Sequence, residues 1–257
     1  MIQGDTYITP EDTPRLLMDR LALGTRAYFV VGILNIINQA RIMCNAGDYD
    51  NQAWVDSSYQ VFKLIEGCGG RFHIQGLANV AASPAPAVFV SNHMSTLETF
   101  VFPCLIQPYR DLTYVVKESL VENSFFGPIM RSRNPIVVSR DNPREDFKTV
   151  MEQGQAILAT GRSIVVFPQS TRTPVFEPEN FNTLGIKLAR AAKVEVIPVA
   201  IKTDFWGNGR WLKDFGPLKR DKPIFISFGK AMVVQGSGKN EHALVIEFIQ
   251  DNLSRWI

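Results

Sequence analysis

The stretch Ala87-Val88-Phe89-Val90-Ser91-Asn92-His93-Met94-Ser95-Thr96-Leu97-Glu98 predicts a strand, a turn and the start of a helix in succession. Residues 87–90 are apolar and β-prone, and two prolines precede them, as expected for a buried strand. A short apolar run of this kind is also compatible with a helix. Ser95 or Thr96 can cap a helix that continues over residues 97–102.

His93 and Glu98 are the residues of this stretch that carry chemistry. In a single helix, a five-residue offset would place them about 140° apart and they would not meet. With His93 in the turn and Glu98 in the first helical turn, the chain can fold back and bring the two side chains together. An imidazole can then take a proton from a hydroxyl at neutral pH, while the carboxylate fixes its tautomer. The alternative is that His93 caps the helix or bonds a backbone carbonyl.

Cationic residues follow the other predicted strands. The strands span residues 112–116, 135–138 and 163–167, and the cations that follow them are Lys117, Arg140 and Arg172. Ligands of open α/β sheets bind beyond the carboxyl ends of the strands. If the strands are parallel, these cations lie at one edge with His93 and suit a phosphate monoester, which arginine can bind bidentately. Each cation taken singly could also be a solvated surface charge.

The rest of the chain alternates between helical and strand patterns. Helices are predicted over residues 144–160, 180–192 and 241–256, and strands over residues 194–201 and 223–228. This alternation predicts an α/β fold with a largely parallel central sheet, covered by helices on both faces.

The N-terminal part predicts a helical hairpin. Thr9 and Pro10 are typical of a helix start, and a helical pattern follows to about Ala46. Its uncharged run, residues 27–40, is too short and too polar at its end for a membrane span. It can lie in the membrane interface together with a second helix over residues 51–66, or the hairpin can pack on the α/β domain as ordinary core.

Composition bounds the class of protein and its partners. The 257 residues are 46% hydrophobic and 20% charged, which is typical of a globular protein with a buried core. A net charge of +2 gives no reason to expect a nucleic-acid partner. The three cysteines have no metal-ligand spacing and are typical of buried thiols in a reducing compartment.

An aromatic loop, residues 204–211, contains two tryptophans and two glycines. It can line an apolar pocket or touch lipid. The simpler interpretation is that its tryptophans pack on the domain.

Four stretches in order resemble the motifs of the glycerolipid acyltransferases of the lysophosphatidic acid acyltransferase type. Asn92-His93 with an acidic residue at position 98 is similar to the first motif, and Val138-Ser139-Arg140 to the second. Phe167-Pro168-Gln169-Ser170-Thr171-Arg172 is similar to Phe-Pro-Glu-Gly-Thr-Arg, and Val196-Ile197-Pro198-Val199 to the proline-centred fourth motif. The resemblance runs from about Arg71 to the C-terminus.

The resemblance implies an acyltransferase. It implies that His93 is the general base, that Glu98 orients it, and that the residues holding the substrate are Lys117, Arg140, Gln169, Thr171 and Arg172. The acyl donor would be a thioester of coenzyme A or acyl carrier protein, attacked directly by the hydroxyl of a lysophospholipid such as 1-acylglycerol-3-phosphate. No bound cofactor and no metal are implied.

The resemblance also implies a division of the chain and a location. Residues 1–70 would form a two-helix membrane-associating segment, and residues 71–257 the α/β acyltransferase domain. The protein would associate with a membrane at its cytoplasmic face, because related enzymes use lipid acceptors.

Four positions depart from the family pattern. Glu98 stands where the family has Asp, Gln169 replaces Glu, Ser170 replaces Gly, and Asn182 replaces a frequent Lys. Most of these changes lie around the expected acceptor site. They leave open a non-glycerophosphate acceptor or a catalytically impaired lipid-binding member. A serine hydrolase is a further alternative, although the chain contains no Gly-x-Ser-x-Gly elbow.

Overall fold

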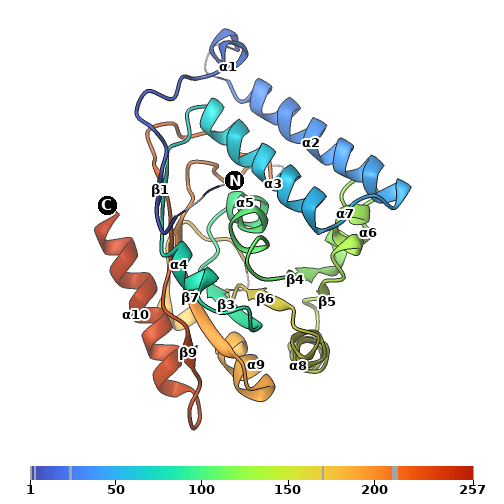
Figure 1. The fold of residues 1–257 in the computed structure, drawn as a ribbon, viewed down its shortest axis with the longest axis vertical. Helices are drawn as coiled ribbons and strands as arrows, with labels where there is room; N and C mark the ends of the chain where they lie inside the picture. The colour runs from blue at the N-terminus through green and yellow to red at the C-terminus, as the bar shows by residue number, and fades with distance from the viewer. Residues whose placement is uncertain (1, 3, 23–24, 170, 210–213, 257) are drawn as a thin grey trace.

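The computed structural model describes residues 2, 4–22, 25–169, 171–209 and 214–256. Within these residues, a nine-stranded sheet has the order β1-β2-β8-β7-β3-β6-β4-β5, with β9 paired to β7 (Figure 1). The strands are β1 (Tyr7–Ile8), β2 (Phe72–Gln75), β3 (Ala87–Ser91), β4 (Leu112–Lys117), β5 (Ile136–Val138), β6 (Ser163–Val166), β7 (Glu195–Lys202), β8 (Ile224–Phe228) and β9 (Met232–Val233).

The middle of the sheet is parallel, as the sequence predicts. Strand β3 pairs in parallel with β6 and β7, and β4 pairs in parallel with β5 and β6. Strand β8 is antiparallel to β7 but parallel to β2, and β1 and β9 are antiparallel to their neighbours. The carboxyl ends of β3, β4, β5 and β6 therefore meet at one edge of the sheet.

Both faces of the sheet are covered by helices (Figure 1). Alternate residues of β3 enter different cores: Phe89 joins the cluster beneath α3 and α5, whereas Val88 joins the cluster beneath α8, α9 and α10. The helices are α1 (Leu17–Leu21), α2 (Ala27–Ala46), α3 (Asn51–Gly67), α4 (Leu77–Ala81), α5 (Leu97–Ile106), α6 (Glu118–Glu122), α7 (Gly127–Ser132), α8 (Pro143–Ala159), α9 (Leu184–Ala192) and α10 (Lys239–Arg255).

The predicted helix start at Thr9 and Pro10 is wrong. Residues 7–8 form the edge strand β1, and the hydroxyl of Thr9 donates to Glu66 and accepts from the backbone N–H of Phe72. These distant partners hold Thr9 in the sheet, so its side chain caps no helix. Helical structure begins only with the short α1, and the long helix α2 starts at Ala27.

Helix α2 is longer than the uncharged run that predicted it. It continues through Arg41 to Ala46, and its 20 residues have the length and mean hydropathy of a possible membrane span. Only 22% of its most apolar window is buried in the protein. The expectation that this segment is too short to span a membrane is therefore wrong by length and composition. Core helices of soluble proteins pass the same test.

The helix predicted over residues 180–192 begins later. Residues 178–180 form a 3₁₀ turn, and α9 starts at Leu184. The Asn182 side chain explains the boundary, since it accepts from the Leu184 N–H and donates to the Pro168 carbonyl. This bond ties the start of α9 to the loop that follows β6.

The aromatic loop packs on the protein where the structure describes it. Phe205 and Trp206 are fully buried, and the Trp206 ring lies edge-on to Phe29 of α2 at 4.7 Å. This contact supports the simpler interpretation of packing for Trp206. Trp211 lies outside the described residues.

Candidate active site

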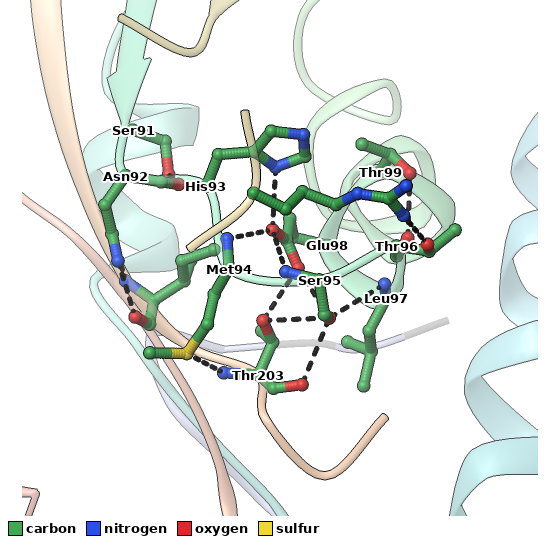
Figure 2. A network of polar contacts seen from close by, with 12 residues as sticks. Ser91, Asn92, His93, Met94, Ser95, Thr96, Leu97, Glu98, Thr99 and Thr203 are labelled. Atoms are coloured by element: carbon green, nitrogen blue, oxygen red, sulfur yellow. Dashed lines mark hydrogen bonds and ion pairs between the residues drawn. The ribbon is translucent and has the colours of Figure 1, made fainter. Parts of the chain in front are cut away.

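The turn between β3 and α5 places His93 and Glu98 in contact. Ser95 and Glu98 form a variant of the capping box at the start of α5: the Ser95 hydroxyl accepts from the Leu97 N–H instead of the Glu98 N–H, and the Glu98 carboxylate accepts from the Ser95 N–H. The same carboxylate oxygen, Oε1, lies 2.9 Å from Nδ1 of His93 (Figure 2). The device that starts the helix therefore also orients the imidazole.

Glu98 is fully buried and surrounded by donors. Its Oε1 also accepts from the Met94 N–H, and its Oε2 accepts from the hydroxyls of Ser95 and Thr203. Burial alone would raise the pKa of Glu98, but its hydrogen bonds and its electrostatic interaction with His93 outweigh burial, and the pKa lies below its ordinary value. Glu98 is thus an anion near neutral pH.

The anionic state of Glu98 fixes the roles of the imidazole nitrogens. Because the carboxylate can only accept, Nδ1 of His93 carries the proton and Nε2 is left as the basic nitrogen. The ring stacks on Phe167 at 4.2 Å, and its side chain is 13% exposed. His93 therefore has the geometry of a general base with one fixed orientation.

A cavity of about 650 Å³ opens beside His93. Its apolar part is lined from α2, α3 and α7 by residues that include Ile37, Ala40, Trp54 and Met130. Beyond the strand ends, cationic side chains join the lining. One cavity therefore connects an apolar interior with a cationic region, and the imidazole belongs to its wall.

Lys117 and Arg140 are the predicted cations that line this cavity. Lys117 ends β4 opposite Val138 of β5, so the two cations follow neighbouring strands. Arg140 has φ +68°, a left-handed conformation that side chains adopt at a cost. The carboxylate of Asp146 holds this turn by accepting from the backbone N–H groups of Ser139 and Arg140.

Arg172 and Thr171 lie differently. Among the described residues, neither belongs to the cavity lining, and Thr171 is exposed. Arg172 bonds the Thr96 hydroxyl and forms a 2.7 Å ion pair with Asp214. Its charge still acts on the cavity residue Arg140. Burial is the main cause that lowers the pKa of Arg140, the positive charge of Arg172 lowers this pKa further, and the negative charge of Asp146 raises it.

The part of the chain that contains these site residues is similar to known proteins. The family model described as Acyltransferase matches residues 71–202, just over half of the chain. The chain belongs to the acyltransferase family. It is therefore an enzyme of the acyltransferase type, and the prediction from the motifs is confirmed at this level.

Individual relatives are similar over different lengths. A 1-acyl-sn-glycerol-3-phosphate acyltransferase of Pseudomonas aeruginosa is 29% identical over 84% of this chain and 76% of its own length. The chloroplastic enzyme LPAT1 of Arabidopsis thaliana is 25% identical over 51% of this chain, which spans only 36% of that protein. The crystal structure of the 1-acyl-sn-glycerophosphate acyltransferase PlsC from Thermotoga maritima has a TM-score of 0.62 at 18% identity, covering 82% of this chain and 81% of that one, and shows the shared fold.

Gln169, a departure from the acyltransferase pattern, is built into the site. Its Oε1 accepts from the His93 N–H at 2.7 Å and its Nε2 donates to the Thr173 hydroxyl at 2.7 Å. The Thr173 N–H in turn donates to the His93 carbonyl. A glutamate could not donate to Thr173, whose own proton goes to Val175. Glutamine is thus the matched side chain here; Ser170 lies outside the described residues.

Several residues of this acyltransferase site escape prediction from the sequence. The Ser-x-x-Glu spacing of residues 95–98 was a signal for the capping box. Nothing local pointed to Thr203 or to the pairing of Arg172 with Asp214, because these contacts join segments far apart in the chain. Lys187 of α9 also lines the cavity, although it belongs to no motif.

Proposed function

We propose that the chain transfers a fatty acyl group from a thioester of coenzyme A or acyl carrier protein to the hydroxyl of a lysophospholipid, such as 1-acylglycerol-3-phosphate. The observation that carries the proposal is the imidazole of His93, which donates to the buried Glu98 and opens onto a cavity with an apolar and a cationic part. The names of the relatives from Pseudomonas and Arabidopsis support this acceptor.

In the proposed reaction, Nε2 of His93 takes the proton as the acceptor oxygen attacks the thioester carbonyl. A C–O bond forms, and Glu98 stabilises the imidazolium through Nδ1. The tetrahedral intermediate then collapses, the C–S bond breaks, and the imidazolium returns the proton to the thiolate. Because no acyl-enzyme forms, a fluorophosphonate probe is not expected to label a serine.

We assign the apolar part of the cavity to the acyl chains. Its walls come mainly from α2, α3 and α7, and its volume lies within the usual range for pockets that hold small ligands. The N-terminal helices would then complete the acyl site of the catalytic domain. Residues 1–70 would then bind the acyl chains in addition to associating with a membrane.

Filling this part of the cavity tests the assignment. Replacing Ala40 of α2, which is buried in the wall, with phenylalanine is expected to lower kcat/KM for a palmitoyl thioester by about tenfold or more, while an octanoyl thioester is affected less. Gln39→Phe on the exposed side of the same helix is the control. Equal losses for both chain lengths, with unchanged thermal stability, would contradict the assignment.

We assign the cationic part to the acceptor phosphate. Lys117 and Arg140 line it. Arg172, which bonds the Thr96 hydroxyl, lies outside the lining but adds its positive charge near Arg140. Arginine suits a phosphate monoester because its planar donors can bind two oxygens at once. Thr171 and Gln169 belong to the loop that carries Arg172, and Gln169 contributes by holding the His93 turn.

A different acceptor is the second candidate. The side chain of Asn182, where a lysine is frequent, is committed to Pro168 and Leu184, and Arg172 is paired with Asp214. Both features lower the positive charge open to a phosphate. The satisfied amide of Gln169 argues against an impaired member, since its bonds hold the His93 turn in place.

We further propose that residues 1–70 associate with the cytoplasmic face of a membrane. Large apolar side chains are exposed along α1 and α2, among them Leu17, Met18, Leu21, Val31 and Ile42. Flotation with phospholipid vesicles tests the membrane association. The intact protein is expected to float with the vesicles, and the double variant Leu17→Ser, Leu21→Ser is expected to show a smaller vesicle-bound fraction.

The function itself is tested by an acceptor screen with purified protein in vesicles. Acyl-CoA and acyl carrier protein serve as donors, and lysophosphatidate, other lysophospholipids and monoacylglycerol as acceptors. Transfer to lysophosphatidate at the highest kcat/KM is expected. A preference for an acceptor without the phosphate monoester would select the second candidate, and thioester binding without transfer would show a lipid-binding protein.

A further inference from the structure

Thr203, directly after β7, carries a hydroxyl that the proposed reaction does not use. The residue is fully buried, and Oγ1 donates a 2.7 Å hydrogen bond to Oε2 of Glu98. The Ser95 hydroxyl lies 3.0 Å from the same carboxylate oxygen and 3.1 Å from Oγ1 of Thr203. Figure 2 shows Glu98 between the His93 ring on one side and Thr203 on the other.

We infer that Thr203 is a positioning residue for acyl transfer, which fixes the Glu98 carboxylate so that its other oxygen meets Nδ1 of His93. The inference rests on the proposed role of His93 as general base. Thr203 itself touches no reacting atom and acts through Glu98 alone.

The geometry of the carboxylate explains why a second anchor matters. The last torsion of a glutamate side chain is broad, so a carboxylate held at one oxygen can still rotate. The backbone donors of Met94 and Ser95 both hold Oε1. Oε2 accepts from the Ser95 hydroxyl at 3.0 Å, and the 2.7 Å bond from Thr203 adds a donor from a different segment of the chain, which removes the remaining freedom of the carboxylate. Hydrogen bonds to the charged form also keep Glu98 ionised.

The segment that carries Thr203 is itself tied to the His93 turn. The Asn92 amide accepts from the backbone N–H of Ile201 and donates to its carbonyl, each at 2.9 Å. The Thr203 N–H meets the sulfur of Met94 at 3.3 Å. Hydrogen bonds from the end of β7 therefore hold the His93 turn in place, and the Thr203 hydroxyl extends this contact to the Glu98 carboxylate.

In the part of the chain that the structure describes, few other titratable groups face Glu98. Tyr114 of β4 is one of them. Burial foremost, and then the charges of Cys104 and Glu98, raise the pKa of Tyr114 well above its ordinary value, so its phenol stays protonated. Lys202 and Asp204, which flank Thr203, are paired with each other at 3.1 Å. A change in the titration of the site after loss of the hydroxyl therefore reports on the His93–Glu98 pair.

The test compares Thr203→Val, which keeps the shape and removes the hydroxyl, with Thr203→Ser, which keeps the hydroxyl. Thr113→Val is the matched control, because Thr113 is also fully buried and its hydroxyl donates to the Arg133 carbonyl, away from Glu98. Thermal unfolding, the pH dependence of kcat/KM and the Nδ1–H proton resonance of His93 are measured for each. The chain has three histidines, so the resonance can be assigned by replacing the other two.

Thr203→Val is expected to lower kcat about tenfold, equivalent to about 1.4 kcal/mol in the barrier. Without the hydroxyl the carboxylate is more basic and the pair takes up a proton more readily, so the acid limb of kcat/KM moves to higher pH by roughly half to one unit. The Nδ1–H resonance shifts as well. Thr203→Ser is expected to have the wild-type kcat, pH profile and Nδ1–H resonance, and Thr113→Val is expected to change none of the three.

Two outcomes separate this inference from the proposed function. If His93→Ala abolishes transfer but Thr203→Val keeps the wild-type pH profile and resonance, the positioning role of Thr203 is refuted and the base assignment stands. If His93→Ala remains active, the base assignment itself fails. If Thr203→Val does not fold, Thr203→Ala, which also lacks the hydroxyl, is measured in its place, and an unchanged pH profile and resonance in that variant refute the inference.

Discussion

Replacing His93 with alanine is expected to lower kcat by about 10²- to 10⁴-fold, the range that a general base contributes. Within the described residues, the ring makes one hydrogen bond, from Nδ1 to Glu98, and one stacking contact, with Phe167. Without it no group at this position can take the proton of the acceptor hydroxyl. Release of the free thiol and formation of the acylated product measure the loss.

The fold is expected to survive this change. The buried charge of Glu98 keeps two backbone N–H donors and two hydroxyl donors after the imidazole is removed. Unpaired buried charges are costly, but this one stays hydrogen-bonded. His73→Ala, at a half-buried histidine of β2 that stacks on Phe225, is the control for loss of an imidazole. Unaltered transfer by a folded His93→Ala protein would rule out the base assignment.

The local part of the site could be predicted because its determinants are close in the sequence. Residues 87–98 encode the strand, the turn and the capping box, so the contact between His93 and Glu98 follows from five residues of chain. The convergence of Lys117 and Arg140 needed one further assumption, parallel strands, and helices alternating with strands justify it.

The rest depends on contacts between distant segments. Thr203 reaches Glu98 across 105 residues, and Asp214 pairs with Arg172 across 42. Thr9 failed as a helix cap for the same reason, because Glu66 holds its hydroxyl across 57 residues. Local patterns determine which side chains can make a bond, whereas the packing of the sheet determines which partner is present.

Replacing Arg140 with alanine is expected to raise KM for lysophosphatidate about 10- to 100-fold, the loss that corresponds to a hydrogen bond with a charged group. A neutral acceptor such as monoacylglycerol should lose far less, because it offers no phosphate to the guanidinium. Arg140 lines the cavity, and Asp146 holds its backbone in the left-handed conformation that the turn requires. Initial rates at varied acceptor concentration, for both acceptors, measure the difference.

Two arginine variants complete this comparison. Arg144→Ala, at an exposed arginine in the first turn of α8 outside the cavity lining, is the control for loss of one positive charge. Arg172→Ala is expected to show the same selectivity as Arg140→Ala with a smaller loss, because Arg172 does not belong to the cavity lining. Equal losses on the phosphate-bearing and the neutral acceptor after Arg140→Ala would show that this arginine does not bind phosphate, and the second candidate, a different acceptor, would then be favoured.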